Sequence, residues 1–175
     1  MSKQFLENSY RGKKQKKEIK GYIRDDSLSG QRAQVYHNPE TKKTIVTHRG
    51  TASKKDLLVD AAVGLGAGKL TNRFQHAKKI QKQAEKKYGK QNIETSGHSL
   101  GGYLTENVTK GKRTTVNKAV ALTDRFKKID KNQTDIRNSL DPVSAIGIFQ
   151  SGGKKSSVRT TLNPYKAHKL KYTLV

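Results

Sequence analysis

The stretch GHSLGG at residues 97–102 constrains the fold more than any other part of this sequence. A β-type run at 93–95 precedes it, and a run compatible with a helix follows it over 100–109. A serine between two glycines at such a junction is typical of a sharp strand-to-helix turn, called a nucleophile elbow. Gly97 and Gly101 allow the tight backbone, and the N-terminal N–H groups of the following helix face developing negative charge. The stretch therefore predicts that Ser99 is a nucleophile in an α/β domain.

Hydrophobic periodicity places further elements on both sides of this turn. Two β-rich runs surround the turn signal at 38–41 and predict a hairpin, whose second run covers 43–48. Apolar residues at steps of three and four predict an amphipathic helix over 72–88, with Asn72 as its cap. Residues 56–68 predict a short helix and loop, 115–122 and 133–140 predict strands, and 151–157 predict a Gly/Ser/Lys loop.

Strands that alternate with helices predict one compact α/β layered domain over residues 21–175. Its central sheet is expected to be mostly parallel, with an N-terminal hairpin and flanking helices. Residues 1–20 are basic and low in apolar content, so we expect a mobile or surface-bound N-terminal arm. They contain no apolar signal-peptide core, and the chain has no apolar run long enough to span a membrane.

A serine nucleophile needs a histidine base and a carboxylate, which follow the serine in the order acid, then histidine, in this architecture. His168 is the only histidine after Ser99, so elimination identifies it as the base. Asp141 is the preferred acid because Pro142 stiffens its loop, with Asp124 as the main alternative.

Two N–H donors are needed to stabilise the oxyanion that forms during acyl transfer. One is expected from Leu100, directly after the nucleophile. The other is expected from Thr51, which follows the strand-like run TIVTH.

The charge of the chain points to an anionic partner. Lys and Arg number 37 against 14 acidic residues, a net charge of +23, while hydrophobic residues make up only 31%. Such a surface favours nucleic acid, an anionic membrane or acidic capsid proteins. The chain has no cysteine, and its five histidines show no metal-ligand spacing, so we expect neither a metal nor a cofactor.

These elements together resemble the class 3 lipase family, the fungal triacylglycerol lipase-like branch of the α/β-hydrolases. The resemblance covers roughly residues 20–175 and rests on HRGT at 48–51, TSGHSLGG at 95–102, DPV at 141–143 and AHKLKY at 167–172. It implies Ser99, Asp141 and His168 as the triad, and Thr51 with Leu100 as the oxyanion hole. His48 stands where the family usually has an aromatic residue. Any lid would have to come from residues 52–70.

The resemblance implies a serine esterase or lipase that hydrolyses carboxylic esters of glycerolipids or phospholipids. A thioesterase or peptidase would use the same turn. Short, basic versions resemble those of large DNA viruses, which would place the protein in a virion or in host cytoplasm. The alternative is a basic structural protein with a hydrolase fold, virion-associated and bound to nucleic acid or capsid partners. Aromatic residues are few and none are interleaved with the basic clusters, which disfavours nucleic acid.

Overall fold

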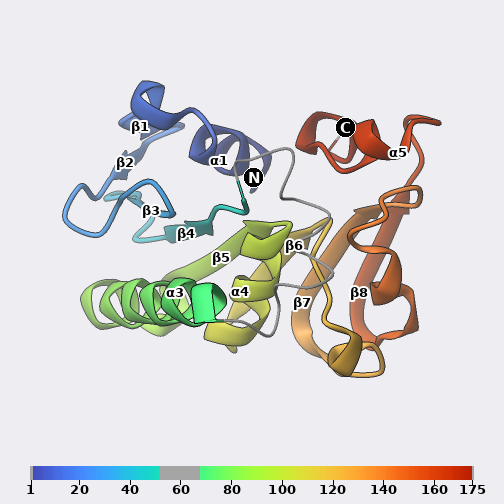
Figure 1. Cartoon of the computed structure of the whole chain (residues 1–175). Coiled ribbons are helices and arrows are strands. Elements are labelled where there is room, and N and C mark those ends of the chain that lie inside the picture. The colour runs from blue at the N-terminus through green and yellow to red at the C-terminus, as the bar shows by residue number, and fades with distance from the viewer. Residues whose placement is uncertain (1, 52–67, 175) are drawn as a thin grey trace.

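A single eight-stranded sheet organises the computed structural model, which describes residues 2–51 and 68–174 (Figure 1). The strands lie in the sheet in the order in which they occur in the chain. β1 to β4 pair antiparallel, and β4 to β8 pair parallel. The strands are β1 (Glu18–Ile19), β2 (Tyr22–Arg24), β3 (Ala33–His37), β4 (Thr44–His48), β5 (Ile93–His98), β6 (Lys112–Val116), β7 (Lys128–Asn138) and β8 (Ser151–Val158).

Helices cover both faces of this sheet. The α-helices are α1 (Ser2–Ser9), α3 (Gly68–Tyr88), α4 (Leu100–Val108) and α5 (Pro164–Ala167). Short 3-10 helices lie at η1 (Gly12–Lys14), η3 (Lys90–Asn92), η4 (Leu122–Asp124), η5 (Ala145–Phe149) and η6 (Leu170–Tyr172). The expected α/β-hydrolase fold, with its antiparallel N-terminal hairpin and mostly parallel sheet, is confirmed.

Alternation along β3 and β4 decides which residues meet which helix. Val35 pairs with Val46 in the sheet, and both pack with Ile80 of α3. The next pair, Tyr36 and Ile45, points to the other face and packs with Phe5 of α1. Because side chains alternate across a strand, one hairpin supplies the apolar core on both sides of the sheet.

The N-terminal residues differ from the arm expected over 1–20. Residues 2–9 form α1, in which Phe5 and Leu6 are buried. Leu6 packs with Val116 of β6 and with Leu170 near the C-terminus. These two buried apolar side chains, together with hydrogen bonds made by Asn8 and Tyr10, hold the segment against the sheet.

Two predicted element boundaries and one predicted element type were wrong. The long helix begins at Gly68, four residues before Asn72, so Asn72 lies inside α3 and does not cap it. β6 ends at Val116, because Asn117 adopts a left-handed conformation with φ 44°. The predicted loop at 151–157 is the edge strand β8, where lysines and polar residues are common. Residues 56–67 of the predicted helix and loop at 56–68, and residues 52–67 of the lid segment at 52–70, lie outside the described residues.

Candidate active site

The turn between β5 and α4 has the backbone expected of a nucleophile elbow. Ser99 has φ 56° and ψ −126°, a conformation that is costly for a residue with a side chain. A Cβ at Gly97 would lie 2.1 Å from the carbonyl oxygen of Gly101, and one at Gly101 would lie 2.0 Å from that of His48. Both glycines are therefore required by close backbone contact. The strain at Ser99 persists because the surrounding backbone fixes the turn.

β6 holds this turn through main-chain hydrogen bonds. The N–H of Ser99 donates to the carbonyl oxygen of Val116 at 3.0 Å, and the N–H of Ala119 donates to that of Ser99 at 3.2 Å. Ser99 therefore lies at the carboxyl end of the sheet, where the ligand sites of open α/β sheets are found.

His168 and Asp141, predicted as base and acid, are in direct contact. Nδ1 of His168 lies 2.8 Å from Oδ1 of Asp141, and both side chains are buried. The Asp141 carboxylate also accepts hydrogen bonds from the N–H groups of Val143 and Ser144, both at 3.1 Å. The structure thus places Asp141, and not Asp124, against the imidazole.

The second ring nitrogen of His168 is available. Nε2 is buried and has no hydrogen-bond partner among the described residues, and within that part of the chain no hydrogen bond joins His168 to Ser99. A buried polar atom without a partner needs an explanation, and such atoms are frequent at catalytic sites.

Two asparagines position the C-terminal segment that carries His168. Nδ2 of Asn117, just after β6, lies 3.0 Å from the carbonyl oxygen of His168 and 2.8 Å from Oγ1 of Thr173. Nδ2 of Asn138, at the end of β7, donates to the carbonyl oxygen of Tyr172 at 3.0 Å. The carboxyl ends of two neighbouring strands therefore hold the histidine near the serine turn.

The segment after β4, where Thr51 was predicted to complete the oxyanion hole, lies against the turn that carries Ser99. A Cβ at Gly50 would lie 3.0 Å from Cβ of Ser99 and 2.6 Å from the carbonyl oxygen of His98. Leu100 is the first residue of α4, where backbone N–H groups have no partner within the helix. Gly50, directly before Thr51, therefore lies against Ser99, and Leu100 follows Ser99 in the chain. The role of Thr51 and Leu100 as oxyanion donors stays a prediction.

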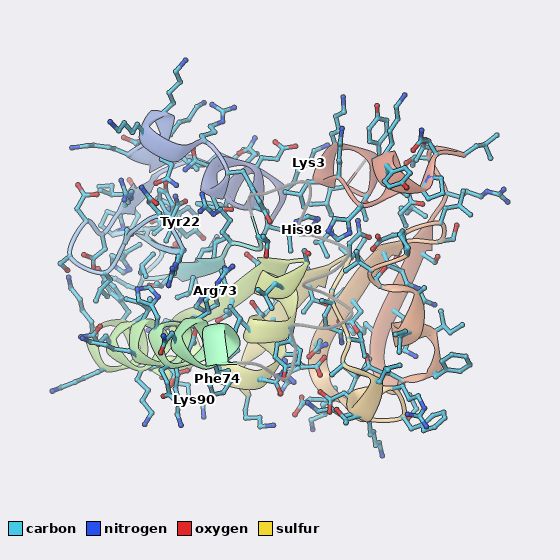
Figure 2. All side chains as sticks on the ribbon, in the orientation of Figure 1. Lys3, Tyr22, Arg73, Phe74, Lys90 and His98 are labelled. Atoms are coloured by element: carbon cyan, nitrogen blue, oxygen red, sulfur yellow. The ribbon has the colours of Figure 1, made fainter. Side chains whose placement is uncertain are left out.

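His98 and Tyr10 belong to this site and were missed by sequence reasoning. Figure 2 shows His98 at the end of the sheet that faces α1 and the C-terminal segment. Its ring lies 4.8 Å from the ring of His168, and its Nε2 lies 2.8 Å from the carbonyl oxygen of His168. Burial and the nearby His168 lower the pKa of His98 to about 3, so its ring is neutral at pH 7. The flanking position of His98 in the elbow was the only available signal.

Tyr10 connects the N-terminal segment to the same cluster. Its hydroxyl lies 2.8 Å from Nδ1 of His98 and accepts a hydrogen bond from the N–H of Gly50 at 3.0 Å. Burial raises the pKa of Tyr10 to about 12, so the phenol keeps its proton. Nothing in the sequence near residue 10 indicates this contact.

No group of three or more His, Cys, Asp or Glu side chains among residues 2–51 and 68–174 could hold a metal ion. In the same part of the chain no helix is long and apolar enough to cross a membrane.

Comparison by sequence identifies the family. Residues 9–150 match the Tle-like phospholipase domain, which is described as phospholipase-like. The chain belongs to the Tle-like phospholipase domain family. This match includes Thr51, Ser99 and Asp141 but ends before His168. No curated protein matches the chain in sequence.

Among the solved structures that are similar to this chain, a fungal lipase supports the fold. The chain is similar to a triacylglycerol lipase from Penicillium expansum, with a TM-score of 0.51 and 15% identity over 95% of this chain and 82% of that one. Lip2 lipase from Yarrowia lipolytica has a TM-score of 0.46 and 15% identity, covering 88% of this chain and 79% of that one. A predicted CIB-like hydrolase from Thermoplasma acidophilum has a TM-score of 0.46 and 16% identity, covering 88% and 89%.

The family and the fold together make this a lipase-like α/β-hydrolase, as the sequence motifs indicated. They give no support to capsid or nucleic-acid partners, or to a viral relationship.

Proposed function

We propose that the protein is a carboxylic ester hydrolase that acts on phospholipids or other glycerolipids. The observation that carries this proposal is the hydrogen bond between His168 and Asp141, which leaves Nε2 of the histidine without a partner, while the residue before the strained Ser99, His98, contacts His168. Membership of a phospholipase-like family supports a lipid ester as the substrate.

In the proposed reaction, Ser99 Oγ attacks the ester carbonyl carbon while Nε2 of His168 takes the hydroxyl proton. Nε2 must come within hydrogen-bond distance of Oγ for this step, and such contacts often tighten only when substrate binds. The tetrahedral oxyanion would accept hydrogen bonds from the N–H groups of Leu100 and Thr51.

The intermediate collapses when the carbon–oxygen bond to the leaving alcohol breaks and His168 returns the proton to that oxygen. Water then attacks the acyl-serine and gives a proton to His168, and Ser99 leaves with that proton as the fatty acid is released. Asp141 accepts the hydrogen bond from Nδ1–H of His168 throughout and stays unprotonated, so it orients the imidazole and stabilises its positive charge.

Fluorophosphonate labelling and fatty-acid release test the proposal together. The wild-type protein should take the label and release fatty acid from phospholipid vesicles, and Ser99→Ala should lose both. Ser156→Ala is the matched control, because Ser156 is an exposed serine on β8. Equal labelling of wild type and Ser99→Ala, or no labelling of either, would rule out Ser99 as the nucleophile.

A further inference from the structure

The end of the chain carries positive charge without any compensating carboxylate side chain. After Asp141 the sequence has no Asp or Glu, and its six cationic residues are Lys154, Lys155, Arg159, Lys166, Lys169 and Lys171. The last four lie in residues 159–171, here called the C-terminal cationic segment, which also contains His168. All four are exposed, and none forms a salt bridge with any described residue.

The same segment exposes two large apolar side chains. Leu162 is 79% exposed and Tyr165 is 73% exposed, whereas Ala167 and Leu170 of the same segment are buried. Asn163 caps α5 by accepting hydrogen bonds from the N–H groups of Tyr165 and Lys166. The outward direction of Leu162 and Tyr165 therefore belongs to an ordered turn, whose inner side packs on the domain.

This surface lies beside the candidate active site. Asn117 and Asn138 hold the segment at the carboxyl ends of β6 and β7, where Asp141 and Ser99 also lie. Figure 1 shows α5 and the C-terminus on the same side of the molecule as α1. A flat, anionic and partly apolar partner bound here would face the serine.

We propose that the C-terminal cationic segment docks the protein on an anionic lipid bilayer, with Leu162 and Tyr165 entering the interface and the four cations binding headgroup phosphates. This inference rests on the proposed function, since it names the surface through which a lipid hydrolase meets its substrate. Tyrosine is favoured at the membrane interface because one end is apolar and the other polar. Lysine and arginine near an anionic leaflet add electrostatic attraction.

A second apolar patch on the molecule does not fit this role. Phe126 and Phe149 are 68% and 57% exposed, and their rings contact each other with centroids 6.2 Å apart. They precede β7 and β8, so they lie at the amino ends of these parallel strands, the opposite end of the sheet from Ser99. A bilayer bound there would not reach the serine.

Vesicle co-sedimentation tests the docking surface separately from catalysis. The protein is used as Ser99→Ala on non-hydrolysable diether phosphatidylglycerol/phosphatidylcholine vesicles, with pure phosphatidylcholine vesicles and duplex DNA as parallel probes. Each cation removed should weaken binding to the anionic vesicles about fivefold, so the triple variant K166Q/K169Q/K171Q should lose about 100-fold. The double variant Leu162→Ser with Tyr165→Ser should lose about tenfold.

Two matched controls keep the test specific. The triple variant K79Q/K82Q/K86Q removes the same charge from exposed positions on α3. Phe126→Ser removes an exposed aromatic side chain from the opposite end of the sheet. Both should bind the anionic vesicles within about threefold of the parent.

Several results would overturn the docking surface. The first is that the α3 triple variant loses as much vesicle binding as K166Q/K169Q/K171Q. The second is that K166Q/K169Q/K171Q loses no vesicle binding. The third is that Leu162→Ser with Tyr165→Ser leaves vesicle binding unchanged. A loss of DNA binding as large as the loss of vesicle binding, with no effect of the two serine substitutions, would assign the surface to nucleic acid. The proposed function is tested separately with the same variants carrying Ser99. Their hydrolysis of a soluble short-chain ester does not depend on a membrane. Wild-type rates there, together with lost vesicle binding, support the docking surface.

Discussion

The hydroxyl of Tyr10 lies 2.8 Å from Nδ1 of His98, and the proton in this contact can be assigned from the partners of the His98 ring. Nε2 of His98 lies 2.8 Å from the carbonyl oxygen of His168, which can only accept, so Nε2 carries the proton. Nδ1 then accepts from Tyr10, whose oxygen accepts in turn from the N–H of Gly50. Tyr10 therefore links the segment after β4 to the serine turn, and through His98 to the backbone of His168.

Removing the hydroxyl with Tyr10→Phe should lower both stability and turnover. Nδ1 of His98 and the N–H of Gly50 lose their partner, and each unsatisfied buried group costs about 1–3 kcal/mol. We expect the free energy of unfolding to fall by about 2–4 kcal/mol, measured by urea denaturation. We also expect kcat for a soluble ester to fall about tenfold with little change in KM, because the groups around Ser99 lose their alignment.

Tyr88→Phe is the control for this prediction. The Tyr88 hydroxyl also makes a hydrogen bond, to Asp25 at 2.8 Å, but it lies at the end of α3, away from the serine. This variant should leave kcat unchanged. If both tyrosine variants reduced kcat equally, Tyr10 would have only a general structural role.

The acid assignment predicts a large difference between two aspartates. Asp141→Asn should keep the protein folded but reduce kcat by about 10³- to 10⁴-fold, because an amide cannot hold the protonated imidazole or its correct tautomer. Asp124→Asn should leave kcat within about threefold of wild type. Steady-state hydrolysis of a soluble ester measures both, and similar losses in the two variants would contradict the assignment.

Most of the candidate site could be predicted from motifs that directly follow strands. Ser99, Asp141 and Gly50 each follow a parallel strand, and the topology of such sheets brings those ends together. Tyr10 could not be predicted in the same way, because its contact with His98 spans 88 residues of the chain. No local periodicity encodes a single side-chain contact at that separation.

Burial patterns explain why some elements were predicted and others missed. The hairpin of β3 and β4 has apolar residues on both faces, and its two β-rich runs on either side of a turn signal made it predictable. β8 is exposed over most of its length and pairs only with β7, so it has no apolar pattern to detect. α1 was missed because Phe5 and Leu6 are too few to establish a helical period.

Close backbone packing at the elbow predicts that Gly101→Ala abolishes the fold around Ser99. The new Cβ would lie 2.0 Å from the carbonyl oxygen of His48, and neither backbone can move without disturbing β4 or α4. We expect a loss of at least about 3 kcal/mol in the free energy of unfolding, seen as a lower Tm in calorimetry. Gly111→Ala is the control, because its Cβ would meet nothing closer than 3.5 Å and should change Tm little.

A buried cluster of charged side chains that joins α4 to β7 is the basis of the last prediction. Nζ of Lys118 contacts the carboxylate of Glu106 and lies 2.9 Å from that of Asp135, and Lys118 and Glu106 are almost completely buried. Burial would raise the pKa of Glu106, but attraction to Lys118 and hydrogen bonds from Lys118 and Gln133 lower it to about 2. Glu106 therefore stays ionised over the whole physiological pH range.

Lys118→Met should be strongly destabilising at pH 7 and less so in acid. Without the ammonium, Glu106 and Asp135 lose their buried counter-ion, which should cost about 3–5 kcal/mol of unfolding free energy. Lys127→Met is the control, because that lysine also contacts Glu106 at 3.1 Å but is 36% exposed, and it should cost less than about 1 kcal/mol.

The pKa of Glu106 is lowered in the folded wild type, so the stability it contributes is present above its ordinary value of 4.5 and is lost as pH falls toward about 2. In the Lys118→Met variant Glu106 can take up a proton at higher pH than in wild type. The difference in unfolding free energy between wild type and Lys118→Met, measured by urea denaturation, should therefore become smaller as pH falls from 7 to 3. A difference that stays constant would mean that lost packing, and not unpaired charge, causes the destabilisation.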